Sequence, residues 1–467
     1  MMKNKGLRLI MGIFFVTGAG LSLADTDENS RRVEEKKRVI IDQAPLNEVV
    51  HRKEYSFESG GWLNYRISDY DELDNDRTEK DYFTRSLRAD VRLWGRLTYR
   101  PSTASDPDKD YIYMRIKDIY TELQGTEPGA RFDNRGPQVD YAYMGMDHNP
   151  WKVEAGRRYF IIGRGIAYSG VHDGVQVNYQ PAGLNCTGFI SQLPPHTSNI
   201  DTSVPGYDKE SRRYFAGAGI ALTKMKQHQI YTYTVLERDH SRERPENPFQ
   251  DYRYDAEYFG LGSNGQWADQ WPYWAEIIRE TGYSREFPSN ARSNISAWAF
   301  DAEQKFSTKW ASKVVFSAEG ALGSGDGDRE VPTNTVYGNR SGRDHGFSYF
   351  GYLPTGAALY PALSNLRLLR LGVDAYPFYR IDLLRKILLG VDYYHYWKDR
   401  SDGGFSDLDA TVARRDIGQE IDLKADWWVT KKVFLSAEWG SFLPGKAYDR
   451  SHRSETQVVS LSMSVIF

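Results

Sequence analysis

The sequence predicts an all-β protein that folds as a single large antiparallel transmembrane β-barrel, with short turns at one end and long loops at the other. Three observations predict this fold. Long stretches alternate apolar and polar residues with the period of two that is typical of strands. Aromatic residues make up 14% of the 467 residues, which suits the aromatic girdles of barrel walls. The mean hydropathy of −0.62 excludes a bundle of membrane-spanning helices but not a barrel, because half of each strand faces water.

The clearest alternating stretch is residues 86–100, S-L-R-A-D-V-R-L-W-G-R-L-T-Y-R. Its odd positions are apolar apart from a glycine, and its even positions carry Arg88, Arg92, Arg96 and Arg100. A helix would also align these arginines but would scatter the apolar residues around its circumference. As a strand the stretch reaches about 45 Å or more, which crosses a tilted path through a bilayer. Such a strand suits a wall with lipid on one face and water on the other.

The N-terminus reads as a secretory signal peptide in residues 1–24. Lys3, Lys5 and Arg8 precede an apolar run that ends in Ser22-Leu23-Ala24. No later stretch approaches 18 apolar residues, so we expect no transmembrane helix after cleavage, which takes the formal charge from −3 to −6. Residues 25–53 are charged and poor in aromatics, and we interpret them as a periplasmic N-terminal segment. The barrel is predicted to occupy residues 54–467.

Alternation continues to the end of the chain, in segments around residues 112–117, 175–180, 231–235, 298–303, 369–375, 387–398, 420–427 and 433–439. Long polar segments at 191–212, 239–250, 323–347, 399–414 and 441–455 alternate with short turns such as 429–432. Short periplasmic turns and long extracellular loops are the outer-membrane pattern. The last strand alternates up to Phe467 and is expected to close the barrel, which removes the sheet edge. A terminal Phe also resembles the assembly signal of bacterial outer-membrane proteins.

Two motifs typical of nucleotide-binding enzymes occur, but the residues around them do not fit what each motif requires. The G-x-G-x-x-G at 260–265 lacks a following helix, and the G-x-x-x-x-G-K at 440–446 has Ala447 where a hydroxyl is needed. We therefore expect no cofactor, no metal, no catalytic residues and no nucleic-acid partner. Residues 323–328 could hold calcium, although a solvated loop explains them as well. A hydrolase with Ser and His meeting across the wall stays open, because triad residues need not be neighbours in sequence.

Charged residues predicted to face the lumen divide the barrel into two halves. The first half is mainly basic, with Arg88, Arg92, Arg96, Arg115 and Lys117. The second half is mainly acidic, with Glu303, Glu319, Asp374, Asp392, Glu420, Asp422 and Glu438. Interior charges can simply keep a lumen wet, but a basic track in a confined channel also attracts anions. A ladder of arginines would suit a polymer with a carboxylate on each sugar.

Several motifs resemble those of the alginate export porins. The segments are R-D-I-G-Q-E-I-D-L at 415–423, F-L-P-G-K-A-Y at 442–448, G-R-R at 156–158, R-x-H-x-F at 343–347 and L-S-N-L at 363–366. Their order matches that of the family. The resemblance implies a monomeric barrel of about eighteen strands in the bacterial outer membrane, gated by loops or turns. It also implies an arginine-rich constriction, to which Arg157 and Arg343 would contribute, that conducts an anionic exopolysaccharide outward.

We therefore expect a porin that conducts an alginate-like polyuronate through a pore lined by Arg88, Arg92, Arg96, Arg115, Arg157, Arg164 and Arg343, with Asp392 and Glu420 as counter-charges. Lys117 and Arg370 are further candidates. The family's second arginine is Tyr360 here, so a related uronate polymer or another anion stays open. Expected partners are the polysaccharide, outer-membrane lipid, a periplasmic scaffold and an inner-membrane synthase. The alternatives are a general or small-anion uptake porin and, in another class, an outer-membrane hydrolase.

Overall fold

The computed structural model describes residues 50–51, 55–71, 83–100, 108–125, 131–134, 136–194, 212–225, 227–240, 253–330 and 339–467. The predicted signal peptide, nearly all of the 25–53 segment and most of the loops predicted at 191–212 and 239–250 lie outside these residues. Part of the loop predicted at 323–347 also lies outside them. Across the described residues, no helix is long and apolar enough to cross a membrane.

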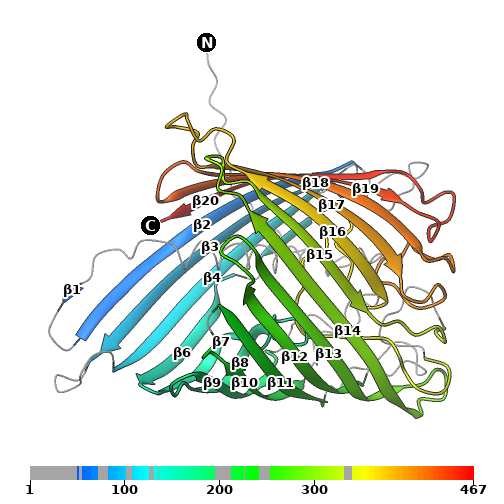
Figure 1. The fold of residues 1–467 in the computed structure, drawn as a ribbon, viewed down its shortest axis with the longest axis horizontal. Coiled ribbons are helices and arrows are strands. Elements are labelled where there is room, and N and C mark those ends of the chain that lie inside the picture. Colours follow the sequence, from blue (N-terminus) through cyan, green and yellow to red (C-terminus); the bar gives the residue numbers. More distant parts are fainter. Residues whose placement is uncertain are drawn as a thin grey trace.

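Within the described residues, eighteen strands of nine to seventeen residues pair in sequence order and close into an antiparallel barrel (Figure 1). The first nine are β2 (Tyr55–Tyr70), β3 (Phe83–Tyr99), β4 (Lys109–Gly125), β6 (Gln138–His148), β7 (Trp151–Ile161), β8 (Ser169–Tyr179), β9 (Leu184–Gln192), β10 (Arg213–Leu222) and β11 (His228–Asp239). The second nine are β12 (Asp255–Gln266), β13 (Pro272–Arg285), β14 (Arg292–Ser307), β15 (Val315–Gly323), β16 (Leu366–Ala375), β17 (Ile387–Lys398), β18 (Asp416–Trp428), β19 (Val433–Pro444) and β20 (Thr456–Ile466). Two short strands, β1 (Val50–His51) and β5 (Arg131–Asn134), add to β2 and β4.

The last strand closes the barrel, as predicted. β20 pairs with β19 on one side and with β2 on the other, from Trp62↔Ile466 to Tyr70↔Val458. Phe467 and Gly61 exchange backbone hydrogen bonds of 2.9 and 3.0 Å at the end of this seam. Each of the eighteen wall strands among the described residues therefore pairs on both sides, and the wall has no open edge there.

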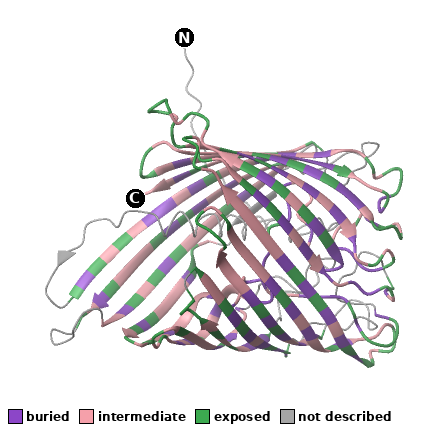
Figure 2. Cartoon of the chain, in the orientation of Figure 1, coloured by how far each residue is buried: buried purple, intermediate pink, exposed green. Residues whose placement is uncertain are grey.

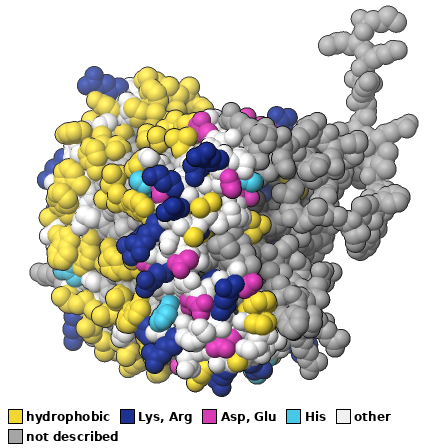
Figure 3. All heavy atoms as spheres, turned by 90° about the vertical axis from the view of Figure 1, so that its right-hand side faces the viewer, with side chains coloured by type: hydrophobic (Ala, Val, Ile, Leu, Met, Phe, Trp, Pro, Cys, Tyr) yellow, Lys and Arg dark blue, Asp and Glu magenta, His cyan; other side chains and the backbone are white. Residues whose placement is uncertain are grey.

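The predicted alternation is confirmed along the walls, where buried and exposed residues follow each other strand by strand (Figure 2). On β4, Ile112, Met114 and Ile116 are exposed on the outer face, whereas Arg115 is 4% exposed on the inner face. On β3, Val91, Leu93 and Leu97 face outward. Figure 3 shows hydrophobic side chains covering one part of the surface and charged side chains a strip beside them. This arrangement fits an apolar band in lipid beside a water-exposed end.

The two ends of the barrel differ in their connections, as predicted. One end, here called the turn side, carries the connections 149–150, 180–183, 223–227, 267–271, 308–314, 376–386 and 429–432. The other end, the loop side, carries the connections 324–365, 399–415 and 445–455 among others, and the first two are longer than any of these turns. In outer-membrane barrels the short turns face the periplasm.

Two loop-side segments fold into the lumen and contact each other there. The first, residues 162–168, joins β7 to β8, and the second is residues 344–366. Phe350 N donates to Ala167 O at 3.0 Å and Tyr352 N to Gly165 O at 3.0 Å. The segments approach so closely that a Cβ on Gly351 would lie 1.9 Å from the carbonyl oxygen of Gly165. The aromatic core inside the barrel, including Tyr168 and Phe347, packs around this crossing.

Candidate solute pathway in the lumen

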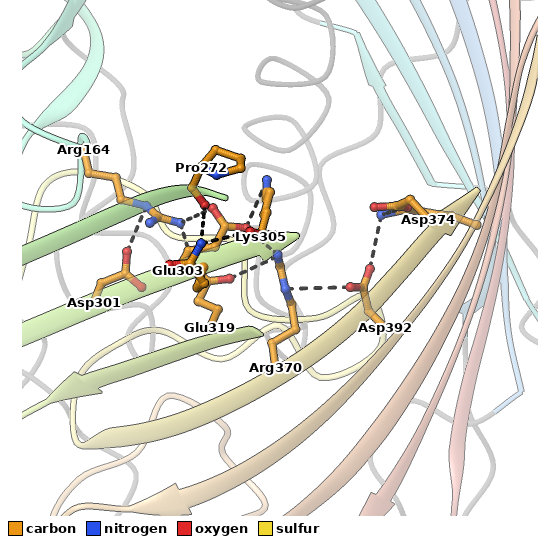
Figure 4. A network of polar contacts seen from close by, with 11 residues as sticks. Arg164, Pro272, Asp301, Glu303, Lys305, Glu319, Arg370, Asp374 and Asp392 are labelled. Carbon is orange, nitrogen blue, oxygen red and sulfur yellow. Dashed lines mark hydrogen bonds and ion pairs between the residues drawn. The ribbon is translucent and has the colours of Figure 1, made fainter. Parts of the chain in front are cut away.

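Arg164 lies on the first inward segment and reaches the opposite part of the wall (Figure 4). Its Nε lies 2.8 Å from Asp301 Oδ2 on β14, and its Nη2 lies 2.8 Å from Glu319 Oε1 on β15. Its backbone N–H donates to Glu276 Oε2 on β13 at 2.8 Å. β7 and β14 are seven strands apart around the ring, so these contacts cross the lumen. Gly163 permits the approach, because it has a φ of +59° and a Cβ there would lie 2.4 Å from Glu276 Oε2.

Arg370 on β16 extends this network of alternating charges. It contacts Glu303 Oε1 at 2.8 Å, Glu319 Oε2 at 3.1 Å and Asp392 Oδ1 at 3.7 Å. Lys424 on β18 then contacts Asp392 and Asp374 at 3.2 and 3.0 Å. Arg164 and Arg370 therefore share Glu319, and Asp392 joins Arg370 to Lys424.

A cavity of about 330 Å³ lies within this network. Its lining consists of four cationic residues, three carboxylates and four others, namely Arg164, Lys305, Arg370, Lys424, Glu303, Asp374, Asp392, Ser317, Tyr352, Leu353 and Pro354. The cavity lies between the inward segments and the wall from β14 to β18. Its charges can bind and orient an anion, and no residue pattern there points to covalent chemistry.

A second charged cluster lies on β3, β4 and β6. Arg92 contacts Asp90 at 2.9 Å and Asp140 at 3.0 Å. Arg115 and Lys117 contact the same Asp140 at 2.5 and 3.4 Å. Asp140 occupies a β-bulge, since the register passes from Arg115↔Tyr141 to Ile116↔Val139 and leaves it out. One inward carboxylate thus holds three cations.

Sequence reasoning missed Asp140, although the sequence held a signal. Val139 is exposed on the outer face, but further along the same strand the exposed residues are Met144 and Met146. This change of parity requires an extra residue between them, which is the bulge. The four expected arginines of this half take the inner face of their strands. Arg88, Arg92 and Arg115 are buried there, and the Arg96 guanidinium lies 4.3 Å from the centroid of the Tyr111 ring.

Arg157 and Arg343 do not line the lumen with these residues. The register of β7 runs without a shift through Gly156, so the bulge that would have turned Arg157 inward is absent among the described residues of this strand. Arg157 instead pairs with Asp173 at 2.7 Å on the face opposite that of Glu154, and Arg158 contacts Glu154 on the inner face. Arg343 is exposed at the loop side, beside the buried Asp344.

Glu420 is a loop anchor rather than a pore-lining counter-charge. Its carboxylate is 1% exposed and accepts backbone N–H donors from Ala357, Ala358 and Leu359 at 2.5, 2.7 and 2.9 Å. The expected lumen-facing direction is correct, but the second inward segment covers the carboxylate. Glu280 holds the same segment by accepting from Ser348 N at 2.9 Å. Asp392 does line the cavity, as expected of a counter-charge.

The structure also shows where the residues considered for a hydrolase and for a calcium site lie. Ser191, Tyr168 and His172 form a buried chain, with Tyr168 Oη 2.5 Å from Ser191 Oγ and 2.6 Å from His172 Nδ1. The tyrosine hydroxyl lies between serine and imidazole, which is not the serine–histidine contact of a hydrolase triad.

In the 323–328 segment, considered for calcium, Asp326 accepts backbone N–H donors from Asp328 and His345. No group of three His, Cys, Asp or Glu residues suited to a metal occurs in the described part of the chain.

Comparison with known proteins identifies the family. The family model described as "Alginate export" matches residues 119–460, which is 342 of the 467 residues. The chain belongs to the alginate export family. The expected membership is therefore confirmed, and with it the assignment to the bacterial outer membrane. None of the curated proteins compared with the chain matches it.

Solved structures show the same fold at low identity. OccK5 (OpdH) of Pseudomonas aeruginosa has a TM-score of 0.56 and 8% identity, covering 88% of this chain and 98% of its own. OccAB1 of Acinetobacter baumannii has a TM-score of 0.57 and 10% identity, covering 88% and 96%. OccK8 (OprE) of P. aeruginosa has a TM-score of 0.54 and 9% identity, covering 88% and 98%. This alginate export family member is thus an outer-membrane porin with an eighteen-stranded barrel.

Proposed function

We propose that this porin conducts an anionic polysaccharide, an alginate-like polyuronate, out of the cell. The observation that carries the proposal is the cavity in which Arg164, from the inward segment, and Arg370, from the wall, meet Lys305 and Lys424. Four cationic groups around about 330 Å³ provide repeated partners for the carboxylates of a uronate chain. In this proposal a periplasmic scaffold and an inner-membrane synthase deliver the polymer to a monomeric barrel.

The wall carboxylates suit conduction better than tight binding. Each cavity cation already contacts at least one carboxylate, as in the Lys305–Glu303 contact of 3.1 Å and the Lys424–Asp374 contact of 3.0 Å. A uronate carboxylate therefore exchanges with a wall carboxylate instead of filling an empty site. The net affinity of each step stays low, which passage through a channel requires, because a bound group must also leave.

A small-anion uptake porin is the second candidate, and the small volume of the cavity favours it. The two candidates differ in how the length of an oligouronate affects block of the ion current. A polymer conduit engages several cations at once, so block strengthens from monouronate to longer oligomers. A small-anion porin takes one carboxylate at a time, so block is independent of length.

Planar-bilayer recordings test the proposal. The reversal potential under a salt gradient reports ion selectivity, and added oligouronates of increasing length report block. We expect anion preference and length-dependent block in the parent protein, and a loss of both in the Lys305→Gln, Lys424→Gln double variant. Arg157→Gln is the matched control, since this arginine pairs with Asp173 on the outer face of β7, away from the cavity. Cation preference, or no block at any length, would overturn the assigned cargo.

A further inference from the structure

The turn side of the barrel carries a strongly uneven distribution of charge. The turns 308–314, 376–386 and 429–432 together hold seven cationic residues and one acidic residue, a formal net charge of +6. The other five connections at this end are 100–108, which joins β3 to β4, and the turns 149–150, 180–183, 223–227 and 267–271; their sequences hold three cationic and three acidic residues. The net positive charge of this end therefore comes from the turns between β14 and β19. We call these three turns the cationic rim.

The three turns of the cationic rim are neighbours in space. They join strands that pair consecutively from β14 to β19. Tyr376 N donates to Ser312 O at 2.7 Å, which links the first two turns. Ile387 lies opposite Trp427 in the register, which brings the second turn next to the third.

The cations of the rim are exposed and available to a partner. Lys309, Lys313, Arg380, Arg385, Lys386, Lys431 and Lys432 are all exposed. The 376–386 turn is held by successive backbone hydrogen bonds, in which Ile381 N donates to Phe378 O and Leu384 N donates to Ile381 O, both at 2.9 Å. Figure 1 shows this turn projecting beyond its strands near the top of the view. The turn also exposes Phe378, Ile381 and Leu383, and exposed Trp310 lies on the neighbouring turn.

The same part of the ring carries the cations of the cavity. Lys305 precedes the 308–314 turn on β14, and Lys424 precedes the 429–432 turn on β18. Both line the cavity together with Arg370 and Arg164. Positive groups thus continue from the turn-side mouth into the lumen along one side of the barrel.

We infer that the cationic rim is a capture site for the anionic polysaccharide at the periplasmic mouth, from which the polymer enters the cavity. This inference rests on the proposed function. Charges clustered at the entrance of a channel raise the local concentration of an opposite charge and its rate of entry. Apolar and aromatic residues among the cations offer contact surfaces for sugar rings. A role in binding phospholipid headgroups would place cations around the whole circumference, whereas the other five turns are neutral overall.

The loop side of the same strands has a different net charge. The described loop-side residues 324–330, 339–365, 399–415 and 445–455 hold nine cationic and ten acidic residues, a net charge of −1. An anionic polymer therefore meets a positive field at the turn side and a nearly neutral one at the loop side. Oligouronate should therefore associate faster from the turn side than from the loop side, and this difference in association rate can be measured.

The test measures the association rate of oligouronate block from each side of a planar bilayer. The rim variant combines Arg380→Gln, Arg385→Gln, Lys386→Gln, Lys431→Gln and Lys432→Gln. The matched control combines Arg340→Gln, Arg400→Gln, Arg414→Gln, Arg415→Gln and Arg450→Gln, five exposed arginines of the loop side. Streptavidin block of a biotinylated tag in the 399–415 loop assigns the orientation of each channel. Unchanged single-channel conductance shows that both variants fold.

We expect the rim variant to lower the turn-side association rate about tenfold or more at low salt and to leave the dissociation rate unchanged. The control variant should leave the turn-side rate as it is. Equal turn-side rates in the parent and the rim variant would overturn the inference while leaving the cargo assignment standing. An effect that appears only in bilayers with anionic phospholipid would assign the rim to lipid and also overturn it. Absence of block in the parent protein from either side would overturn the proposed function itself.

Discussion

Arg164 and Glu319 meet inside the barrel, with Nη2 and Oε1 2.8 Å apart, although 155 positions separate them in the chain. The arginine comes from a seven-residue segment that folds inward between β7 and β8, and the glutamate comes from the wall at β15. Their contact attaches the inward segment to the far side of the lumen. It also places a cation in the middle of the proposed path.

Replacing Arg164 with Gln is expected to destabilise the barrel and to shift selectivity toward cations. The change leaves Asp301 and Glu319 without a cation they now share, and removing one partner of a buried ion pair costs about 3–5 kcal/mol. Urea unfolding followed by the loss of heat-modifiable gel mobility measures the stability. The triple variant Arg164→Gln, Asp301→Asn, Glu319→Gln should recover most of it. A single variant as stable as the parent would show that the network contributes little.

Replacing Glu420 with Gln should loosen the second inward segment. A carboxylate accepts the three N–H donors of residues 357–359, whereas an amide turns an N–H group toward some of them. A lost charge-assisted hydrogen bond costs about 1.5–3 kcal/mol. Hydrogen exchange of residues 355–360 should accelerate, and current fluctuations should increase. Glu438→Gln is the control, since Glu438 contacts Arg66 at 3.5 Å elsewhere in the lumen. Equal exchange in both variants would contradict the anchoring role.

Replacing Asp140 with Asn should strengthen anion selectivity and lower stability together. Arg92, Arg115 and Lys117 all contact this carboxylate, so its removal leaves more positive charge facing the lumen. The reversal potential should move further toward that of chloride, and unfolding should begin at a lower urea concentration. Asp173→Asn, which removes the partner of Arg157 on the opposite face of the wall, should leave the reversal potential unchanged. A shift toward cations in Asp140→Asn would refute the prediction.

The packing of two loop-side loops should depend on pH. Tyr448 Oη donates to Asp407 Oδ2 at 2.9 Å, and burial raises the pKa of Asp407. Because this pKa is higher in the folded loop than in the unfolded chain, the stabilisation is present below the unfolded pKa of about 4 and is lost as the pH rises through the folded pKa. Protection factors of residues 399–415 in hydrogen exchange should therefore fall as the pH rises. Asp407→Asn should remove this dependence, and a parent protein with constant protection would contradict it.

Much of the wall could be predicted because the information is local. Alternation within one strand decides which residues face lipid, so the outward Ile112 and the inward Arg115 are readable from their neighbours alone. The same alternation over residues 456–466 indicates a strand, and this strand closes the ring. The motifs of residues 415–423 and 442–448 indicated the family. Apolar alternation, aromatic content and the terminal strand together were enough for the class of fold.

The candidate site was less predictable because its contacts are not local. The expected inward orientation of Arg157 depended on a bulge at Gly156, and the bulge lies instead at Asp140 on the neighbouring strand. Glu420 was predicted on the correct face, but whether it meets a solute or a backbone depends on a segment more than 60 positions away that folds inward. Arg343 lies in a matching motif, yet its place at the loop side follows from how residues 344–366 enter the lumen.

The sequence by itself determined that this chain forms an outer-membrane barrel and which residues of its strands face lipid. Each of these follows from side-chain alternation within single strands, which neighbouring residues specify. Only the tertiary structure decided which charges meet. Closure of the ring sets Arg164 opposite Glu319, and the inward segments cover Glu420 and leave Arg370 and Lys424 on the cavity. Such contacts arise between residues far apart in the chain, so no local pattern can specify them.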